Sequence, residues 1–425
     1  MKLFKKPIFV SLSPNAQADD VFLALKLMVT PWRWRVGRAP EELADKLKEY
    51  LGVKSIFLFE SGRTSLYAVL MGMKLAEDDE VLVQAFTCTA AVNPILWLGA
   101  KPVYVDIEDD FNMSPGDLEQ KITSRSRIVI IQHTFGYPAK VDEILQIARK
   151  HNLLVIEDAA HALGAEYKNK KVGTFGDAAI FSFGRYKIMS SVFGGAAVTN
   201  SPEIAENIKR TLHTWDFPSL FWIFEQLFHP LLLFVAKPFY NFFSVGKVLV
   251  VIAKKLKLIS LSVYSEEKSG GKPPFGPSIM PHALALLGLK QFEKLERFNQ
   301  HRISLTDFYT DKFIYNKKVS LVEFSHDLEP VFLNFPIKIK DADSVYELIG
   351  KGKREGIYLE VWPAKKVIGP SGTDLKKLCY IRGSCPRAEE LSARSLVLPT
   401  SPNTTLSDAG RVVGLVEHFL ETPHA

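Results

Sequence analysis

Short apolar runs and longer stretches with helical spacing take turns along the first half of the chain. The apolar runs have the length of β-strands, and we expect strands at 56–59, 80–83, 102–106, 127–131 and 153–156. The stretches between them predict helices at 64–75 and 141–150. Strands that alternate with helices predict a mostly parallel sheet with helices on both faces. Such a sheet binds ligands beyond the carboxyl ends of its strands, so we expect a functional site at that edge.

The pattern changes after about residue 280. A long helix is predicted over 281–308, a strand over 330–335 and a closing helix over 407–420, which is typical of a smaller α+β domain. We therefore divide the chain into four parts. They are an N-terminal arm (1–40), a large domain (41–210), an apolar helical insertion (211–270), and a connecting helix with a small C-terminal domain (271–425).

Composition narrows the class of protein. With 425 residues and 47% hydrophobic content, the chain can bury a large core in more than one domain. Its formal net charge is +6 and its basic residues are mostly scattered, so we expect no nucleic-acid partner. The three cysteines, Cys88, Cys379 and Cys385, are sparse and odd in number, which indicates a reducing compartment. The apolar stretch after the basic N-terminus is short, so we expect a cytoplasmic protein without a signal peptide.

An acid and a lysine stand after two successive predicted strands. Asp158 follows the apolar run 153–156, and Lys187 closes the run 181–187. A lysine can form a Schiff base with the aldehyde of pyridoxal phosphate (PLP). An aspartate can pair with the pyridinium nitrogen and keep it protonated, so that the ring accepts electrons. The pair therefore indicates a PLP site, and we assign no metal ligands.

Three further features fit the same cofactor. One is a turn that opens a helix and comprises Gly62, Arg63 and Thr64. A helix N-terminus attracts phosphate through its unpaired N–H groups and its dipole. Ser182 supplies a hydroxyl for the phosphate, and His161 can meet the ring hydroxyl. Taken alone, each feature has a plainer interpretation as a helix cap, a structural histidine or a solvated side chain, but the combination is more specific.

In this combination the chain closely resembles the DegT/DnrJ/EryC1/StrS family of PLP-dependent aminotransferases. The resemblance extends from about residue 40 to the C-terminus, apart from one insertion. The stretches that carry it are 99–106, 156–165, 172–177, 181–183, 286–292 and 385–391.

The resemblance implies a fold-type I architecture, with a mostly parallel seven-stranded sheet in the large domain and a smaller α+β domain. It implies that Lys187 is the Schiff-base lysine, Asp158 the pyridinium partner and His161 a neighbour of the ring. Ser182 and the turn at 62–64 would bind the phosphate. Family members usually act as homodimers that transfer an amino group from glutamate to a keto-sugar attached to a nucleotide, in the synthesis of polysaccharides and glycoconjugates.

Three positions depart from the family pattern. Many members place an aromatic ring over the cofactor where this chain has Cys88, so either Cys88 packs on the ring or Phe86 stacks on it. The Gly-Glu segment that usually follows the lysine reads Val192-Phe193, and an asparagine that reaches the partner subunit's phosphate is replaced by Pro277. Two alternatives stay open: a PLP-binding regulatory or membrane-docking protein without turnover, and a sugar dehydratase of the same family. Such dehydratases carry histidine at the lysine position, which argues against the second.

The segment 217–257 is apolar and rich in aromatic residues. Its apolar runs are interrupted by Glu225, Pro230, Lys237 and Lys247, so we do not expect a bilayer-spanning helix, which needs about 20 apolar residues. Two interpretations remain open. In one, the segment packs on the body of the protein or in the dimer interface. In the other, it is a helical hairpin that lies on the inner face of the membrane with its lysines on anionic lipid, and the acceptor is lipid-linked or made at the membrane.

Overall fold

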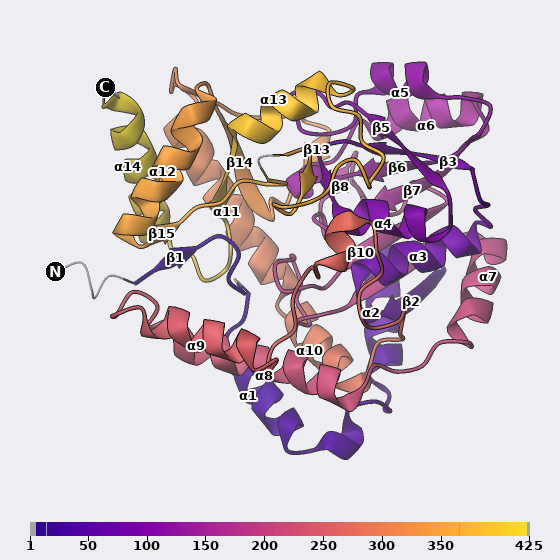
Figure 1. Cartoon of the computed structure of the whole chain (residues 1–425), viewed down its shortest axis with the longest axis horizontal. Helices are drawn as coiled ribbons and strands as arrows, with labels where there is room; N and C mark the ends of the chain where they lie inside the picture. Colours follow the sequence, from indigo (N-terminus) through magenta and orange to yellow (C-terminus); the bar gives the residue numbers. More distant parts are fainter. Residues whose placement is uncertain (1–5, 14, 365, 423–425) are drawn as a thin grey trace.

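The central element is a seven-stranded sheet with the strand order β2–β11–β10–β7–β6–β3–β5. The computed structural model describes residues 6–13, 15–364 and 366–422 (Figure 1). The strands are β2 (Ser55–Phe59), β3 (Glu80–Gln84), β5 (Lys101–Val105), β6 (Ser126–Gln132), β7 (Leu154–Asp158), β10 (Ala178–Ser182) and β11 (Gly195–Thr199). Strand β11 is antiparallel to β2 and β10 on either side of it, and the other pairs in this sheet are parallel. The predicted mostly parallel α/β sheet is thus confirmed.

Alternation along each strand assigns side chains to the two faces of the sheet. Val81 and Val83 of β3 belong to the core under α3 (Gly62–Gly72), α4 (Thr89–Trp97) and α7 (Pro202–Leu212). Leu82, between them, belongs to the core under α5 (Pro115–Lys121) and α6 (Val141–Lys150) on the opposite face. Helix α2 (Ala39–Leu51) covers the β2–β11 end of that sheet. Both faces are therefore buried, as parallel sheets require.

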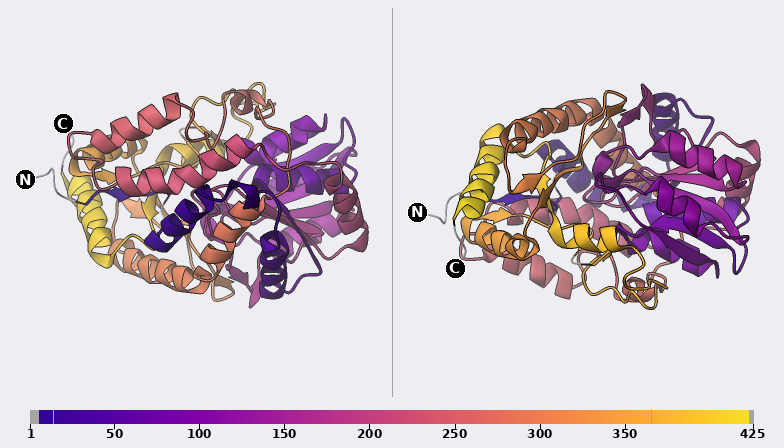
Figure 2. Two further views of the ribbon diagram at one scale, coloured as in Figure 1. Left: turned by 90° about the horizontal axis from the view of Figure 1, so that it is seen from below. Right: turned by 90° about the horizontal axis from the view of Figure 1, so that it is seen from above.

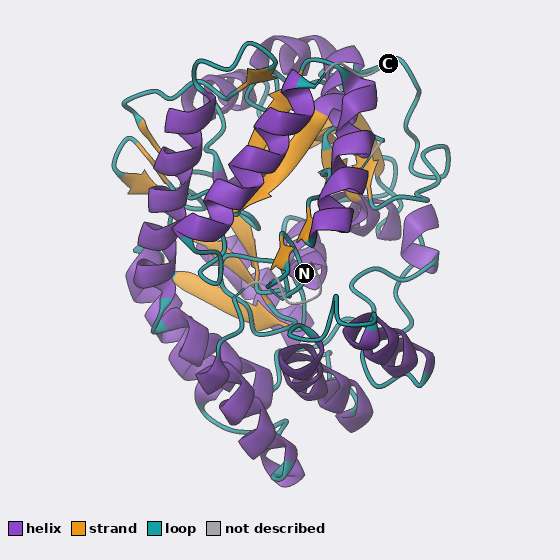
Figure 3. Ribbon diagram, turned by 90° about the vertical axis from the view of Figure 1, so that its left-hand side faces the viewer, coloured by secondary structure: helices purple, strands orange, loops and turns teal. Residues whose placement is uncertain are grey.

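The small domain contains an antiparallel sheet of β12 (Val319–Ser320), β14 (Asn334–Ile339) and β17 (Ser395–Pro399). Its helices are α11 (Leu295–Phe313), α12 (Ala342–Glu355), α13 (Pro386–Arg394) and α14 (Leu406–Glu421). Figure 3 shows these helices packed around the strands. The strand predicted at 330–335 begins later, because the N–H groups of Val331 and Leu333 donate to the carbonyls of Gly136 and Phe135 instead of to a strand.

The single helix predicted over 281–308 is two helices, α10 (His282–Phe292) and α11, separated at Glu293–Lys294. The side chain of Lys294 is drawn towards Asp19 and Asp20 at the start of α1 (Ala18–Met28) and forms ion pairs with both. Both helices bury apolar faces, so the apolar spacing runs on through the break and hides it in the sequence.

The N-terminal arm and the insertion form an outer layer on one side of the molecule (Figures 1 and 2). The arm contains β1 (Ile8–Phe9), which pairs with β15 (Ile357–Tyr358), then α1 and the 3₁₀ helix η1 (Pro31–Arg33). The insertion contains α8 (Leu220–Ala236) and α9 (Val245–Lys255), and α8 packs against both α1 and α9. Within the described ranges, no helix combines the length and apolar character needed to cross a bilayer.

Several short elements connect these layers. They are β4 (Thr87–Cys88), which pairs with β16 (Ile368–Gly369), β8 (Glu166–Tyr167), β9 (Lys170–Lys171), β13 (Leu328–Glu329), and the 3₁₀ helices η2 (Thr134–Gly136) and η3 (Glu266–Ser269). The pairing of β4 with β16 joins the small domain to the edge of the large sheet beside the site described next.

Candidate active site

Lys187 and Asp158 lie beyond the carboxyl ends of two neighbouring parallel strands. Asp158 is the last residue of β7, and its strand pairs with β10, after which Lys187 follows in the loop to β11. Burial lowers the pKa of Lys187 below its usual range, although Cys88 and Asp158 oppose the shift. Burial also raises the pKa of Asp158, with the backbone of Ala160 and the charge of Lys187 acting in the other direction. The two groups are thus close enough to influence each other's proton.

Two adjacent acids end β7, and the structure separates their roles. Glu157 points to the face away from the lysine, where His133 Nε2 lies 3.0 Å from one carboxylate oxygen. The N–H groups of Gly173 and Gly176 also donate to Glu157, over 2.7 and 2.8 Å. Hydrogen bonds of this kind stabilise a carboxylate, and the pKa of Glu157 is lowered although burial opposes this. Asp158 is therefore the acid of the pair that faces the lysine.

His161 lies beside an aromatic cluster at the same edge of the sheet. Its Nδ1 accepts a hydrogen bond from the N–H of Phe135 over 3.3 Å, and its ring meets Trp362 edge-on at 5.0 Å between centroids. Burial, with the charge of Lys187, lowers the pKa of His161 well below its usual range. The imidazole is therefore neutral, and the accepting Nδ1 leaves the proton on Nε2.

Phe86 and Cys88, the two residues considered for packing on the cofactor ring, lie in different places. Phe86 is completely buried among Phe111, Phe135 and Trp362, with ring centroids 5.2 to 6.0 Å away. These contacts surround its ring, and stacking of Phe86 on a cofactor stays a prediction. Cys88 is half-buried, and its pKa is raised by burial while the charge of Lys187 opposes the shift. On this segment, Cys88 is the residue that borders the lysine.

The start of α3 lies directly against Ser182. Ser61 caps the helix by accepting a hydrogen bond from the N–H of Thr64 over 3.3 Å, and Gly62 is the first helical residue. A methyl group on Gly62 would lie 2.8 Å from the Cβ of Ser182 and 3.1 Å from its Oγ. Only glycine allows this approach, which brings the hydroxyl beside the first N–H groups of the helix. Those groups have no carbonyl of their own helix to bind and suit an anion.

Arg63 and Thr64 have partners of their own within the chain, and a contact of their side chains with a phosphate stays a prediction. The guanidinium of Arg63 forms a buried ion pair with Glu267 and donates to the carbonyl of Ser262 over 2.8 Å. The hydroxyl of Thr64 donates to Glu60, and burial raises the pKa of that acid to about 7. The backbone N–H groups at the start of α3 and the hydroxyl of Ser182 lie side by side at this turn.

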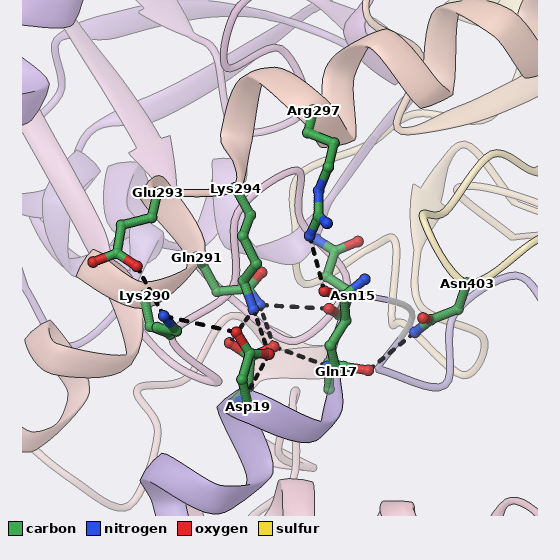
Figure 4. Close-up of polar contacts among 11 residues, drawn as sticks. Asn15, Gln17, Asp19, Lys290, Gln291, Glu293, Lys294, Arg297 and Asn403 are labelled. Atoms are coloured by element: carbon green, nitrogen blue, oxygen red, sulfur yellow. Dashed lines mark hydrogen bonds and ion pairs between the residues drawn. The ribbon is translucent and has the colours of Figure 1, made fainter.

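Asn15, in the N-terminal arm, holds the loop that carries Lys187. Its Nδ2 donates to the carbonyls of Lys187 and Ile188 over 2.6 and 2.7 Å. Arg302 of α11 donates to its Oδ1 over 2.7 Å. Gln291 of α10, shown beside Asn15 in Figure 4, donates to its carbonyl. Nothing in the local sequence marks Asn15, because its partners are distant along the chain.

The insertion also supports this loop, through Arg185. The guanidinium is buried and donates to Gln226 of α8 over 3.0 Å and to the carbonyl and hydroxyl of Ser260 over 2.8 and 2.7 Å. It lies 5.2 Å from the centroid of the Phe193 ring, which in turn packs edge-on against Trp222 of α8. Burial lowers the pKa of Arg185 to about 10, although Tyr186, Tyr264 and Glu225 oppose the shift. The aromatic departure at 193 therefore fills a space between the loop and the insertion.

Val192 and Pro277 are the other two departures from the family pattern, and the structure shows the backbone conformation of the first and the surroundings of the second. Val192 adopts a φ of 71°, a left-handed conformation that costs a β-branched residue roughly 1–2 kcal/mol. A glycine, which the family carries there, would adopt it without strain. Pro277 precedes Ser278, whose N–H donates to Glu60 over 3.1 Å, so this segment extends along the edge of the sheet beside β2.

Comparison with known proteins places these features in a family. The model of the DegT/DnrJ/EryC1/StrS aminotransferase family matches residues 17–216 and 253–417, and the unmatched gap covers α8 and most of α9. The chain is 38% identical to GDP-perosamine synthase of Caulobacter vibrioides over 198 residues, 46% of this chain and 53% of that protein. It is 35% identical to UDP-4-amino-4,6-dideoxy-N-acetyl-beta-L-altrosamine transaminase of Campylobacter jejuni over 176 residues, 41% and 46% of the two chains. The matches span about half the length of these curated relatives.

Solved structures share the fold over nearly the whole chain. Helicobacter pylori PseC, an aminotransferase involved in the biosynthesis of pseudoaminic acid, superposes with a TM-score of 0.76 at 21% identity, over 98% of this chain and 100% of that one. S. venezuelae DesV superposes with a TM-score of 0.73 at 24% identity, over 96% and 95% of the two chains. The family model matches well over half of the sequence, and the chain belongs to the DegT/DnrJ/EryC1/StrS aminotransferase family.

Proposed function

We propose that the protein is a PLP-dependent aminotransferase that moves an amino group from glutamate to a nucleotide- or lipid-linked keto-sugar, in the synthesis of surface polysaccharides or glycoconjugates. The observation that carries the proposal is the convergence of Lys187, Asp158 and Ser182 at the ends of neighbouring strands, with Ser182 against the start of α3. The relatives named GDP-perosamine synthase and UDP-aminosugar transaminase support a sugar acceptor.

The residues present match the functional groups of PLP. The cofactor has an aldehyde, a ring nitrogen, a ring hydroxyl and a phosphate, and the site offers an amine, a buried carboxylate, a neutral imidazole and a helix N-terminus with a hydroxyl. We assign these to Lys187, Asp158, His161 and Ser182 with the Gly62 turn. The contact between Gly62 and Ser182, which a single methyl group would disrupt, is the structural observation that favours phosphate at this place.

When bound, PLP supplies an electron-accepting ring that makes the α-proton of an amino acid removable. The lowered pKa of Lys187 favours its neutral amine, which would hold the aldehyde and, when free, would take up and return the proton of the donor's α-carbon. Asp158 would supply the negative charge that keeps a proton on the ring nitrogen. His161, whose Nδ1 accepts from Phe135, would have its Nε2–H available for the ring hydroxyl.

We extend the proposal to the assembly and location of the protein. The family resemblance favours a homodimer, and the cavity lined by Thr64 and Tyr67 of α3 and by Pro277 is where a partner subunit would complete the site. We place the protein in the cytoplasm, with α8 and α9 at the inner face of the membrane, because these helices expose many apolar side chains beside several lysines.

The absorbance of the purified protein tests this function. Reconstitution with PLP is expected to give a visible band that bleaches on addition of L-glutamate, with release of 2-oxoglutarate, and returns on addition of a nucleotide-linked keto-sugar. Lys187→Ala is expected to lose the band and the turnover, whereas Lys209→Ala, an exposed lysine on α7, is expected to retain both. Full activity of Lys187→Ala would refute the assignment. A band that no amino donor changes would favour a PLP-binding protein without turnover.

A further inference from the structure

A cavity of about 680 Å³ lies between the N-terminal arm, the insertion and the loop before α14. Its walls are mainly apolar: Ile8, Phe9 and Leu12 of the arm face Leu233, Phe234 and Phe239 of the insertion. The volume lies within the range of about 300–1,000 Å³ that is usual for sites of small ligands. None of the residues assigned above to the PLP site lines this cavity.

The rim of the cavity is continuous with an exposed apolar surface. Phe234 and Phe239 line the cavity, yet 54% and 47% of their surfaces are exposed. The exposed apolar side chains on the same two helices and their connection include Val235, Phe243, Val248, Val251, Ile252 and Leu256. An apolar area of this kind on a soluble domain marks a surface that contacts a partner or a lipid phase. Figure 2 shows α8 and α9 side by side on the outside of the molecule, next to α1.

The charge of this region indicates which kind of partner it contacts. Between residues 217 and 257 the only acid is Glu225, whereas the segment contains five lysines, at positions 237, 247, 254, 255 and 257. Lys237 and Lys6 both line the cavity, and Asp408 pairs with Lys6. An apolar surface among lysines is the pattern of a helix that lies on an anionic membrane, with the aromatic side chains at the depth of the headgroups.

We propose that the cavity holds one hydrocarbon chain of an anionic phospholipid while the face formed by α8 and α9 lies on the membrane surface. The headgroup phosphate is then placed beside Lys237 and Lys6, and the chain runs between the arm and α8. The proposal rests on the membrane location proposed above and adds a defined lipid site to it.

The position of the cavity also connects it to the reactive lysine. Ala16 lines the cavity, and its neighbour Asn15 holds the carbonyls of Lys187 and Ile188. Lys237, at the rim, donates to the carbonyl of Ser13 over 2.7 Å. A lipid chain packed against Ile8, Leu12 and Ala16 therefore also supports the segment that holds the lysine loop.

Binding of phosphatidylglycerol with a fluorescent label on its acyl chain tests the site, because the label brightens when the chain enters an apolar cavity. We expect saturable binding of one lipid per chain. Leu233→Trp, which fills the cavity, and Phe234→Gln, at its exposed rim, are each expected to weaken binding at least tenfold. Val248→Trp, on the exposed face outside the cavity, serves as the matched control and is expected to bind like the unaltered protein.

Co-sedimentation with vesicles separates the cavity from the surface. The unaltered protein and Leu233→Trp are both expected to sediment with vesicles of phosphatidylcholine and phosphatidylglycerol, and not with phosphatidylcholine alone. Equal binding of the labelled lipid by Leu233→Trp, Phe234→Gln and Val248→Trp would overturn the lipid site. Two other results would also overturn the lipid site. One is binding of the labelled lipid without any association with vesicles, and the other is burial of the α8–α9 face in a dimer of this chain. Bleaching of the PLP band by glutamate, recorded on the same samples, reports on the transaminase function separately.

Discussion

The buried ion pair between Arg63 and Glu267 gives the sharpest prediction for stability. The side chain of Arg63 is 7% exposed and that of Glu267 is 1% exposed, so neither charge is screened by water. Glu267 also accepts a hydrogen bond from the N–H of Tyr264 over 2.8 Å. Replacing Glu267 by alanine leaves a guanidinium buried at the start of α3 without its counter-charge.

Removing one partner of a buried pair costs about 3–5 kcal/mol. For a chain of 425 residues that unfolds as one unit, an unfolding entropy of about 2.1 cal/mol/K per residue gives about 0.9 kcal/mol/K in total. Glu267→Ala is therefore expected to lower the melting temperature by about 3–6 °C. Glu267→Gln is expected to lose less, because its amide oxygen can still accept from Arg63.

Differential scanning calorimetry of the protein without added cofactor measures this effect. Glu266→Ala, which removes the exposed neighbouring acid, is the matched control and is expected to change the melting temperature by less than about 1 °C, since isolated surface charges contribute little. The double variant Arg63→Met with Glu267→Met is expected to recover most of the loss, because a pair of apolar side chains leaves no buried charge. A melting temperature of Glu267→Ala equal to that of Glu266→Ala would refute the desolvated pair.

Three further predictions concern the site itself. Gly62→Ala is expected to weaken PLP binding by about 1–3 kcal/mol, because the added methyl group overpacks against Ser182. Titration of the visible band measures the affinity. Gly276→Ala, whose added methyl group meets no atom within 4 Å, is the control, and equal affinities of the two variants would contradict the contact. Asn15→Ala leaves the carbonyls of the lysine loop without a donor, at a cost of about 1–3 kcal/mol, so hydrogen exchange in 184–192 is expected to rise; unchanged exchange would argue against the clamp. Burial lowers the pKa of Lys187 from 10.5, so its amine loses its proton at lower pH. The rate at which the visible band forms after PLP addition is therefore expected to rise with pH, with a midpoint below 10.5. A midpoint at or above 10.5 would contradict the lowered pKa.

The elements that the sequence predicts well are those whose information is local. The strands that end at Asp158 and precede Lys187 could be located from short apolar runs, and parallel pairing then brings their carboxyl ends together. The partner of Arg63 could not be located in this way, because Glu267 is 204 positions away and lies in a segment without regular spacing. The same holds for Asn15, 172 positions before the lysine whose carbonyl it binds.

Phe86 shows a second limit of prediction from the sequence. Phe86 and Cys88 lie on one short segment, and the sequence does not tell which of the two side chains points towards the lysine. Phe86 packs on Trp362, which comes from the small domain, at 5.4 Å between centroids. A contact between residues so far apart along the chain could not be predicted from the local sequence.

The contact between Asn15 and the lysine loop has a consequence for the order of synthesis. The lysine loop is held by Asn15 of the arm, which is translated before the loop. It also depends on Arg302, which binds Asn15 and is translated more than 100 residues after Lys187. A nascent chain that ends before α11 contains every strand of the large sheet but lacks Arg302, whose side chain donates to Asn15. Domains generally form from the N-terminus onwards during translation. The sheet can therefore form early, whereas the loop around the reactive amine is completed only after α11 has been translated.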